Sequence, residues 1–570
     1  MSDIMTPQAS SKNKVLHDYS PSLNFYRSDV IFRHVISKEL KPGTLEEIND
    51  RLEELGERAA TEMDALSLQA DKHGPELVKR NFLGETVDEI RFHPAYESLT
   101  RLAVKSGMFS LKWDPQYRER FGPERHRVGF APGFLFTLVE NGLYCPLCMT
   151  DGAARLVDKY CADEDRERLM PHIWTENAED LYTGAMFLTE KAGGSDVGAN
   201  LVKAVHEKDD YYRLYGEKWF CSNVNAEVIF ALARTDDSVQ GTRGLSIFLV
   251  EPTLPDGSKN DLNIVRLKDK LGVRSMASAE CVMQGTLARR VGAEGEGFRI
   301  MTDMINLSRL YNSMSAIGMT RRGLVEAYTF LKHRHTFGAE ALDHALVRGK
   351  LAELAALYNA NFYMTWRAIR ALDNADNGNE SETHLLRLLT PMLKRCTAAN
   401  SVYSIRESME LMGGMGYIED GVIPKFMRDS MVLPIWEGAG NIMLLDMLRA
   451  TAKSDGFKHL CTEISTTLAG WSHPQAAECL NLLQNLINLA AALTDKDADT
   501  MQYSAKPLFE KLTLLMQVSV LISYNDEVSS AWIEPSVNTL LRMLFPEGLG
   551  IQSPPDRGTV EKMVGWDIYK

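Results

Sequence analysis

A series of short apolar segments between residues 181 and 290 most constrains what this chain can fold into. The segments are rich in β-favouring residues and are separated by gaps that contain Asp, Gly and Pro. They cover residues 184–188, 211–214, 228–233, 244–250, 263–267 and 279–283. This spacing, without helical crossovers, predicts a small antiparallel sheet or barrel and not βαβ units. No GxGxxG sequence follows any segment, which argues against a Rossmann dinucleotide site.

Helical patterns flank this region on both sides. Within residues 44–77, apolar side chains recur at intervals of three and four, the period of an amphipathic helix. Further helices are predicted over residues 134–143, 151–157, 163–174, 298–331, 344–374, 380–411, 441–451, 478–493 and 507–522. A chain of 570 residues is too long for one core. We therefore expect a mainly α protein with a central β domain, divided into residues 1–180, 181–290, 291–450 and 451–570.

The overall charge and the cysteines narrow the class of protein. The net charge is −14, so the surface as a whole gives no reason to expect nucleic acid or an anionic membrane as a partner. The eight cysteines have no repeated spacing, which is typical of reduced thiols inside a cell. We favour core packing over zinc for Cys145 and Cys148, because no second pair accompanies them.

The chain start and the hydropathy bear on location. No opening apolar run resembles a signal peptide, and no stretch of about twenty apolar residues could span a bilayer. We therefore expect a cytoplasmic protein that is not in a membrane. The first dozen residues are polar and are expected to be disordered.

A single carboxylate stands among apolar and glycine neighbours between Pro434 and Asn441, in the sequence Pro-Ile-Trp-Glu-Gly-Ala-Gly-Asn. Glycine has no Cβ, so a flat ligand or a backbone can approach closely. Glu437 should be partly desolvated in such surroundings, which raises the pKa of a carboxyl group and suits it to moving protons. An ordinary turn at a helix start fits the same segment, and the segment alone leaves both interpretations open.

Two earlier segments have features of a site for a flat, phosphorylated ligand. Residues 186–196 contain paired glycines and Ser195, whose N–H and hydroxyl groups could hold a pyrophosphate, although an ordinary β-turn fits as well. Residues 216–223 place two large rings beside Ser222, which could wall a heterocycle and donate to one of its nitrogens. The alternative for this second segment is a strand whose rings belong to the core.

A fourth segment, residues 334–338, follows a long predicted helix and reads Arg-His-Thr-Phe-Gly. Arg334 could pair with a phosphate group. Basic residues are also favoured at helix C-termini for electrostatic reasons, so a solvated helix end is the alternative.

Taken together and in their order along the chain, the segments 186–196, 216–223, 334–338 and 434–441 resemble the acyl-CoA dehydrogenase family. The shared pattern is a T-E-x-x-x-G-S-D type loop, a G-x-K-x-W-x-T-N type strand, R-x-x-F-G, G-G-x-G and E-G, covering about residues 90–450. The similarity is greatest to the AidB-like branch, through Phe92-His93-Pro94, Cys145-Pro146, and residues 216–220, 267–272 and 435–441. The appended region after residue 450 also fits that branch.

The resemblance implies an acyl-CoA dehydrogenase-like fold: an N-terminal helical domain, a β-barrel or sandwich domain, a C-terminal four-helix bundle and an appended helical domain. It also implies FAD bound between the β domain and the bundle. The positions that match cofactor contacts of the family are Phe187, Leu188, Thr189, Gly194, Ser195, Phe220, Ser222, Arg334, Phe337, Glu410, Gly413, Gly414, Ala439 and Asn441.

Several of these matches carry a specific implied role. Ser222 matches the hydroxyl residue that faces flavin N5, and Phe220 takes the place of the usual tryptophan beside the ring. Arg334 and Phe337 match residues that reach FAD from a neighbouring subunit, so the resemblance implies a homodimer or homotetramer. Glu410 stands where the family often has Gln, as does Ala345, and this change alters the contacts expected at both positions.

The implied activity is that of an FAD-dependent oxidoreductase acting on CH–CH groups. Its substrate would be an acyl-CoA of fatty acid or branched-chain acyl metabolism, and an electron-transfer partner would accept the electrons. Glu437 matches the base that removes the α proton while flavin N5 accepts a hydride from Cβ, and Arg309 matches an arginine close to that base. Some members carry the base at the position of Ser308, but serine is no unassisted base at neutral pH. No metal ligands are implied.

The AidB-like branch raises a second function, association with DNA or protection from alkylation damage. DNA binding in that branch is attributed to a basic C-terminal domain. Residues 451–570 here carry nine basic and fourteen acidic residues. Duplex binding requires several phosphate contacts, so we favour the enzyme and expect no appreciable DNA binding at physiological salt. A basic patch on the folded chain would have to come from Arg321, Arg322, Lys332, His333, Arg334, Lys394 and Arg395.

Overall fold

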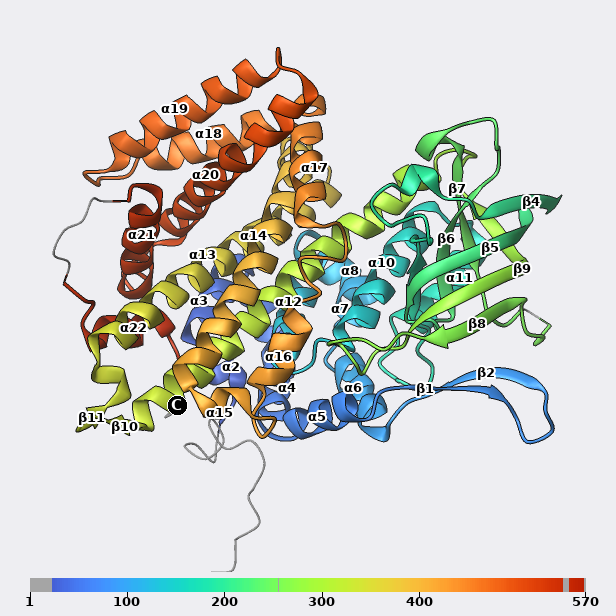
Figure 1. Cartoon of the computed structure of the whole chain (residues 1–570), viewed down its shortest axis with the longest axis horizontal. Helices are drawn as coiled ribbons and strands as arrows, with labels where there is room; N and C mark the ends of the chain where they lie inside the picture. The colour runs from blue at the N-terminus through green and yellow to red at the C-terminus, as the bar shows by residue number, and fades with distance from the viewer. Residues whose placement is uncertain (1–22, 255, 547–552, 568–570) are drawn as a thin grey trace, which may run out of the picture.

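The structure, a computed structural model, describes residues 23–254, 256–546 and 553–567. Long helices form the centre of the molecule, the central β domain lies at one side, and the C-terminal helices lie over the opposite corner (Figure 1). The disorder expected for the first dozen residues concerns positions outside the described ranges. No helix within those ranges combines the length and the apolar character needed to cross a membrane.

The N-terminal part is mainly helical. Its helices are α2 Phe25–Ser28, α3 Val30–Glu39, α4 Pro42–Arg58, α5 Asp64–Lys72, α6 Pro94–Lys105, α7 Ser110–Trp113, α8 Pro115–Phe121, α9 Arg125–Thr137, α10 Tyr144–Tyr160 and α11 Asp163–Ile173. A π-helical turn, Ala59–Met63, joins α4 to α5.

The prediction of one helix over residues 44–77 is wrong at its end. Helix α5 stops at Lys72, and β1 Glu76–Arg80 pairs antiparallel with β2 Thr86–Arg91. Proline cannot donate a backbone hydrogen bond, so the His73-Gly74-Pro75 sequence ends the helix. Both strands are largely exposed, and no regular apolar alternation marks them in the sequence.

The helix predicted over residues 134–143 is also wrong in its second half. Helix α9 ends at Thr137 and α10 begins at Tyr144. Gly142 lies in the break, where a Cβ atom would collide with the Ser275 hydroxyl of the β domain. This contact with a residue far away in the chain cannot be inferred from local periodicity.

The central domain contains seven strands: β3 Gly184–Phe187, β4 Lys203–Lys208, β5 Tyr211–Ser222, β6 Val228–Arg234, β7 Leu245–Val250, β8 Leu262–Leu267 and β9 Ser278–Val291. The pairings β6–β7–β9–β5–β4–β6 close a ring, which is a small barrel, and β8 and β3 pair with β9 and β6. The β3–β6 pair is parallel, so the purely antiparallel expectation is wrong there. The β4–β5 hairpin supplies the long connection that a parallel pair needs.

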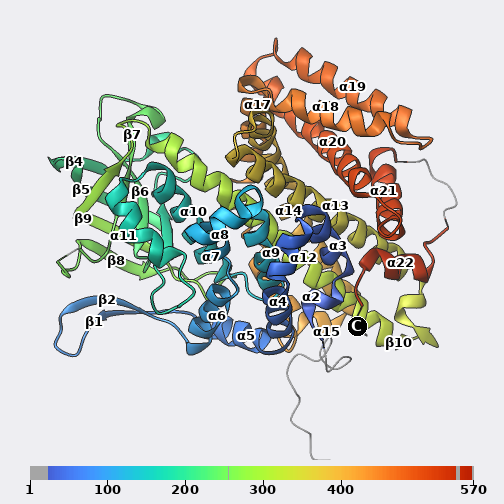
Figure 2. The same cartoon turned by 180° about the vertical axis from the view of Figure 1, so that it is seen from behind.

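The bundle is formed by α12 Gly297–His333, α13 Ala345–Asp376, α14 Glu380–Met412 and α17 Gly440–Lys453. Its shorter elements are β10 His335–Thr336, β11 Ala339–Glu340, α15 Gly414–Tyr417 and α16 Ile423–Ser430. Helix α12 has 37 residues, a length of about 55 Å at 1.5 Å per residue. It runs from the β domain to the far side of the molecule in both views (Figures 1 and 2).

The appended helices pack onto this bundle. They are α18 Gly456–Ala469, α19 Ala476–Leu493, α20 Ala498–Tyr524, α21 Ser530–Leu544 and α22 Arg557–Val564. The Arg321 guanidinium of α12 donates to the Asp29 carboxylate at 2.8 and 2.9 Å and to the Gly565 carbonyl at 3.0 Å. Residues near both ends of the chain are therefore anchored to α12. The domain limits at residues 181, 291 and 451 remain a proposal, and the last falls within α17.

Candidate active site

Glu437 occupies a strained turn between α16 and α17. Its backbone φ is 56°, in the left-handed region that disfavours non-glycine residues, and the next residue, Gly438, has φ 102°. Seven described non-glycine residues have positive φ, and four of them lie in the predicted motifs: Phe220, Asn223, Phe337 and Glu437. Backbone strain of this kind persists where surrounding contacts enforce it, and it concentrates at functional sites.

Two buried cations hold the carbonyl groups of this turn. Arg309 Nε donates to the Glu437 carbonyl at 3.1 Å, and Lys394 Nζ donates to the Gly438 carbonyl at 2.6 Å. Asp446 in turn accepts from the Arg309 guanidinium at 2.7 Å. These contacts fix the direction in which the Glu437 side chain leaves the turn.

Burial and the same two cations together set the pKa of Glu437. Burial raises the pKa of Glu437 to about 7, and the positive charges of Arg309 and Lys394 oppose that rise. Burial also lowers the pKa of Lys394 to about 7, with the Glu437 charge acting in the opposite direction. A carboxylate that titrates near neutrality is well matched to general base catalysis.

Glu437 lines a cavity of about 300 Å³ between α10 and α12. The other lining residues are Asn141, Tyr144, Cys145, Cys148, Met149, Ser308, Tyr311, Asn312, Ser315 and Trp436. Cys145 and Cys148 are buried, as expected for core packing, and in addition they face this cavity. Burial, followed by the nearby Glu437 charge, raises the pKa of the Cys145 thiol to about 12, so the thiol stays protonated at neutral pH.

The β domain brings the two predicted ligand segments together. The Trp219 N–H donates to the Thr189 carbonyl at 2.8 Å. Lys218 and Glu190, both buried, form an ion pair at 2.7 Å between the strand and the loop. Phe220 presents a ring that is 60% exposed. The loop of residues 189–195 and the Phe220 face therefore form one surface.

A chain of polar side chains leads from this surface toward the cavity. Ser222 Oγ lies 3.3 Å from Ser278 Oγ, and Lys270 Nζ donates to Ser278 Oγ at 3.2 Å. Burial lowers the pKa of Lys270 to about 8, while the Cys145 thiol of the cavity wall acts in the opposite direction. Ser222 is therefore connected to Lys270 through the Ser278 hydroxyl.

The remaining predicted cofactor residues lie elsewhere in the chain. Arg334 is 25 residues beyond Arg309, about 38 Å along α12 and its end. Phe337 is 99% exposed there. The last turns of α14 pack against the C-terminal part of α12, because a Cβ atom at Gly323 would lie 3.4 Å from Ser408 Oγ. Lys394, which contacts the Glu437 turn, is 16 residues before Glu410, about 24 Å along α14. Glu410, Gly413 and Gly414 therefore lie away from Glu437 within one chain.

Four of the seven residues of the basic patch considered from the sequence are buried or paired with an acid. Arg321, Arg322 and Lys394 are buried. Arg322 pairs with Asp64 at 2.6 Å, and Arg395 pairs with Glu510 at 2.9 Å. These cations are used in packing and are not displayed together on one surface.

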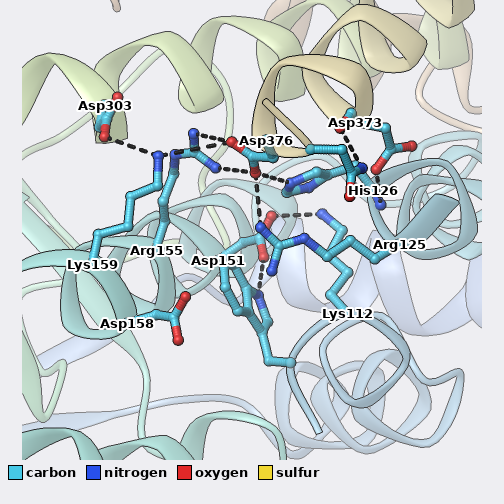
Figure 3. Close-up of polar contacts among 12 residues, drawn as sticks. Lys112, Arg125, His126, Asp151, Arg155, Asp158, Lys159, Asp303, Asp373 and Asp376 are labelled. Carbon is cyan, nitrogen blue, oxygen red and sulfur yellow. Dashed lines mark hydrogen bonds and ion pairs between the residues drawn. The ribbon is translucent and has the colours of Figure 1, made fainter. Parts of the chain in front are cut away.

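The sequence gives no signal for the position of Lys394 beside the Glu437 turn, nor for a group of buried charges beside the cavity. We call the latter the buried ion cluster: Lys112, Arg125, His126, Asp151, Arg155, Asp373 and Asp376 (Figure 3). Their partners lie on separate helices, so no sequence spacing reveals them. A lysine or aspartate in an otherwise apolar helix face was the only available signal.

No group of three or more His, Cys, Asp or Glu side chains suited to a metal ion occurs in the part of the chain that the structure describes.

Comparisons with known proteins identify the family to which the chain belongs. Family models match residues 18–178 as the adaptive response protein AidB N-terminal domain, 185–286 as the acyl-CoA dehydrogenase middle domain and 295–452 as the acyl-CoA dehydrogenase C-terminal domain. The chain belongs to the acyl-CoA dehydrogenase family, which confirms the resemblance and the fold.

Within that family, the chain is 31% identical to the putative acyl-CoA dehydrogenase AidB of Escherichia coli (strain K12), over 78% of this chain and 81% of the relative. It is also 31% identical to acyl-CoA dehydrogenase family member 11 of Caenorhabditis elegans, over 75% and 70%. The crystal structure of Caenorhabditis elegans ACDH-11 in complex with C11-CoA superposes with a TM-score of 0.87, at 26% identity, covering 96% of this chain and 94% of that one.

Proposed function

We propose that this chain is an FAD-dependent acyl-CoA dehydrogenase in which Glu437 removes the α proton of an acyl-CoA thioester. The observation that carries the proposal is a carboxylate with pKa raised to about 7, held in a strained turn at the wall of a cavity. A steady-state assay with an artificial electron acceptor tests it. We expect enoyl-CoA to form in proportion to acceptor reduced, and absence of enoyl-CoA with every acyl-CoA tried would reject it.

The residues present fit a flavin. The Phe220 ring is exposed at a left-handed backbone position, next to Ser222. At Gly413 and Gly414 an added Cβ would meet no atom within 4 Å, so a ligand can approach the backbone. We assign FAD contacts to Phe187, Leu188, Thr189, Gly194, Ser195, Phe220, Ser222, Ala439 and Asn441 in one subunit. When bound, FAD supplies the hydride acceptor of the reaction.

The protein's own contribution is to hold the substrate and to move one proton. We assign proton removal to an ionised Glu437 oxygen, and we assign the Glu437 N–H as a donor to the thioester carbonyl. Arg309 and Lys394 keep the turn rigid during this transfer through the two carbonyl groups they bind. Burial of the Glu437 carboxyl removes it from bulk water, which strengthens these electrostatic interactions.

FAD binding should depend on assembly. Arg334 and Phe337 lie too far from the Glu437 site to join it within one chain, so we assign them, with Glu410, Gly413 and Gly414, to the FAD of a neighbouring subunit of a homo-oligomer, either a dimer or a tetramer. We expect Arg334→Ala to weaken FAD retention by about tenfold, because a charged hydrogen bond is lost. Flavin absorbance after gel filtration measures this. A monomer that retains stoichiometric FAD would contradict the assignment.

The pH dependence of kcat/KM should reflect the positive charges of Arg309 and Lys394 near Glu437. Activity requires ionised Glu437, so kcat/KM should rise with pH through about 7. Lys394→Met removes a positive charge that lowers the pKa of Glu437. We expect the rising limb to move up by about one pH unit, since a neighbouring opposite charge shifts a pKa by one unit or more.

Two variants serve as controls for this shift. Lys394→Arg keeps the charge and should restore most of the wild-type profile. Arg395→Met alters the next residue of α14, which pairs with Glu510 on α20, and should not move the profile. An unchanged pH profile in Lys394→Met would show that Lys394 does not act on the base.

Partners and location follow from the same proposal. A dehydrogenase must pass its electrons on, so we propose an electron-transfer protein as acceptor and the cytoplasm as compartment. We do not extend the proposal to DNA association, because the appended region is acidic and four of the seven residues of the candidate basic patch are buried or paired with an acid.

A further inference from the structure

Two tyrosines separate the cavity from the buried ion cluster. Tyr144 and Tyr311 both line the cavity, and their ring centroids lie 5.2 Å apart. The Phe130 ring packs against Tyr311 with a centroid distance of 4.6 Å. All three side chains are almost fully buried. The Tyr311 ring is therefore confined between two other rings.

The Tyr311 hydroxyl is held by hydrogen bonding within the Lys112–Asp151 ion pair. Tyr311 Oη donates to Asp151 Oδ2 at 2.8 Å, and Lys112 Nζ donates to the same oxygen at 2.6 Å. Trp113 Nε1 donates to the other Asp151 oxygen at 2.6 Å. Lys112 and Asp151 have no exposed side-chain surface. Displacing Tyr311 would remove one donor from a buried carboxylate, which is unfavourable because no water can replace it there.

The space beyond Tyr311 is unsuited to an alkyl chain. Next to the Lys112–Asp151 pair lie His126, Arg125 and Asp376 (Figure 3). Asp376 Oδ2 lies within 2.8 Å of both the His126 ring and the Arg125 guanidinium. Methylene groups inserted here would break charged hydrogen bonds without replacing them. The cavity cannot lengthen in this direction by a simple change of rotamer.

The cavity itself is short and its lining carries no cation. On α12 its lining runs from Ser308 to Ser315, about 10 Å of helix. At its other end, Ser315 Oγ donates to Asn141 Oδ1 at 2.5 Å. No Lys, Arg or His lines it, so a terminal carboxylate on the acyl group would have no partner.

On the basis of the proposed function, we infer that this chain selects short, uncharged acyl groups. Tyr311, held in place by the Lys112–Asp151 pair, sets the limit on chain length. Tyr311 is thus a specificity-determining residue. Its position depends on the Lys112 and Asp151 side chains, which do not contact the substrate.

The test measures binding separately from turnover. The FAD-loaded Glu437→Gln protein is titrated calorimetrically with butyryl-CoA and with dodecanoyl-CoA. We expect butyryl-CoA to bind more tightly. Adding Tyr311→Ala should shift the ratio of the two dissociation constants by about tenfold or more toward dodecanoyl-CoA, because a few methylene groups in a matched pocket discriminate at this level.

Controls separate this effect from general loosening of the core. Tyr358→Ala removes an equally buried tyrosine that does not line the cavity, and it should leave the ratio unchanged. If Tyr311→Ala does not fold, Tyr144→Ala tests the same barrier with the same expected shift.

Tighter binding of dodecanoyl-CoA by the parent protein, or an unchanged ratio after opening the barrier, would overturn the inference. A short-chain preference in binding together with no turnover of any acyl-CoA by the wild type would instead reject the proposed function alone.

Discussion

Glu437→Gln should lower the rate of anaerobic flavin reduction by acyl-CoA by about 10³–10⁴-fold, the upper range for loss of a general base. Glutamine keeps the size of the side chain but cannot accept the α proton. Arg309 and Lys394 bind backbone carbonyl groups of the turn, so the turn itself should survive the change. Stopped-flow absorbance of the FAD-loaded protein measures the rate.

FAD content must be unchanged for this result to bear on catalysis. Glu437 is not among the proposed FAD contacts, so stoichiometric flavin should remain. Glu478→Gln, an exposed substitution of the same kind on α19, should match the wild type. Full-rate flavin reduction in Glu437→Gln would show that another group is the base.

The second large effect is on stability. Asp376→Asn should lower the free energy of unfolding by about 3–5 kcal/mol at pH 7, because it leaves buried cations without a counter-charge. Asp376 accepts from Arg125 at 2.8 Å and from Arg155 at 2.7 and 2.8 Å, and it also contacts His126. Denaturant midpoints followed by fluorescence measure the loss.

The loss of unfolding free energy in Asp376→Asn should become smaller as the pH falls. Burial opposes ionisation of Asp376, but hydrogen bonds from His126 and Arg155 outweigh it and hold the pKa of this carboxyl well below its usual range. Its stabilisation is therefore complete above the unfolded pKa of about 3.9 and disappears as the pH falls further. The difference between Asp376→Asn and the wild type should narrow below about pH 4.

A matched surface change provides the control. Asp163 is 81% exposed and pairs with Arg166 three residues later on α11. Asp163→Asn should alter stability by no more than about 0.5 kcal/mol. Equal effects of the two substitutions would mean that the buried ion cluster contributes no specific stabilisation.

The sequence contains enough local information to predict the α–β–α order and the turn at Glu437. Six of the seven strands of the central domain are anticipated by compact apolar runs, which are continuous in the fully buried β6 and β7. β4 was missed since it reads Lys-Ala-Val-His-Glu-Lys and is mostly exposed. The segment around Glu437 is visible as a turn or a site because a lone carboxylate is followed by two glycines in an apolar stretch.

What the sequence cannot provide is contact between distant residues. Lys394 was interpreted as a possible member of a basic surface, yet it is buried against the turn of the base. The Tyr311–Asp151 contact joins positions 160 residues apart. Neither periodicity nor a motif predicts such pairs, because they follow from how α10, α12 and α14 pack.

The most direct measurement is an anaerobic titration of the FAD-loaded protein with short-chain acyl-CoAs, followed through the visible flavin band. We predict that the band is lost in proportion to substrate and that an equal amount of enoyl-CoA appears. A fully loaded protein whose flavin band survives excess butyryl-CoA, dodecanoyl-CoA and every other acyl-CoA tried would contradict the assignment of acyl-CoA dehydrogenation to this chain.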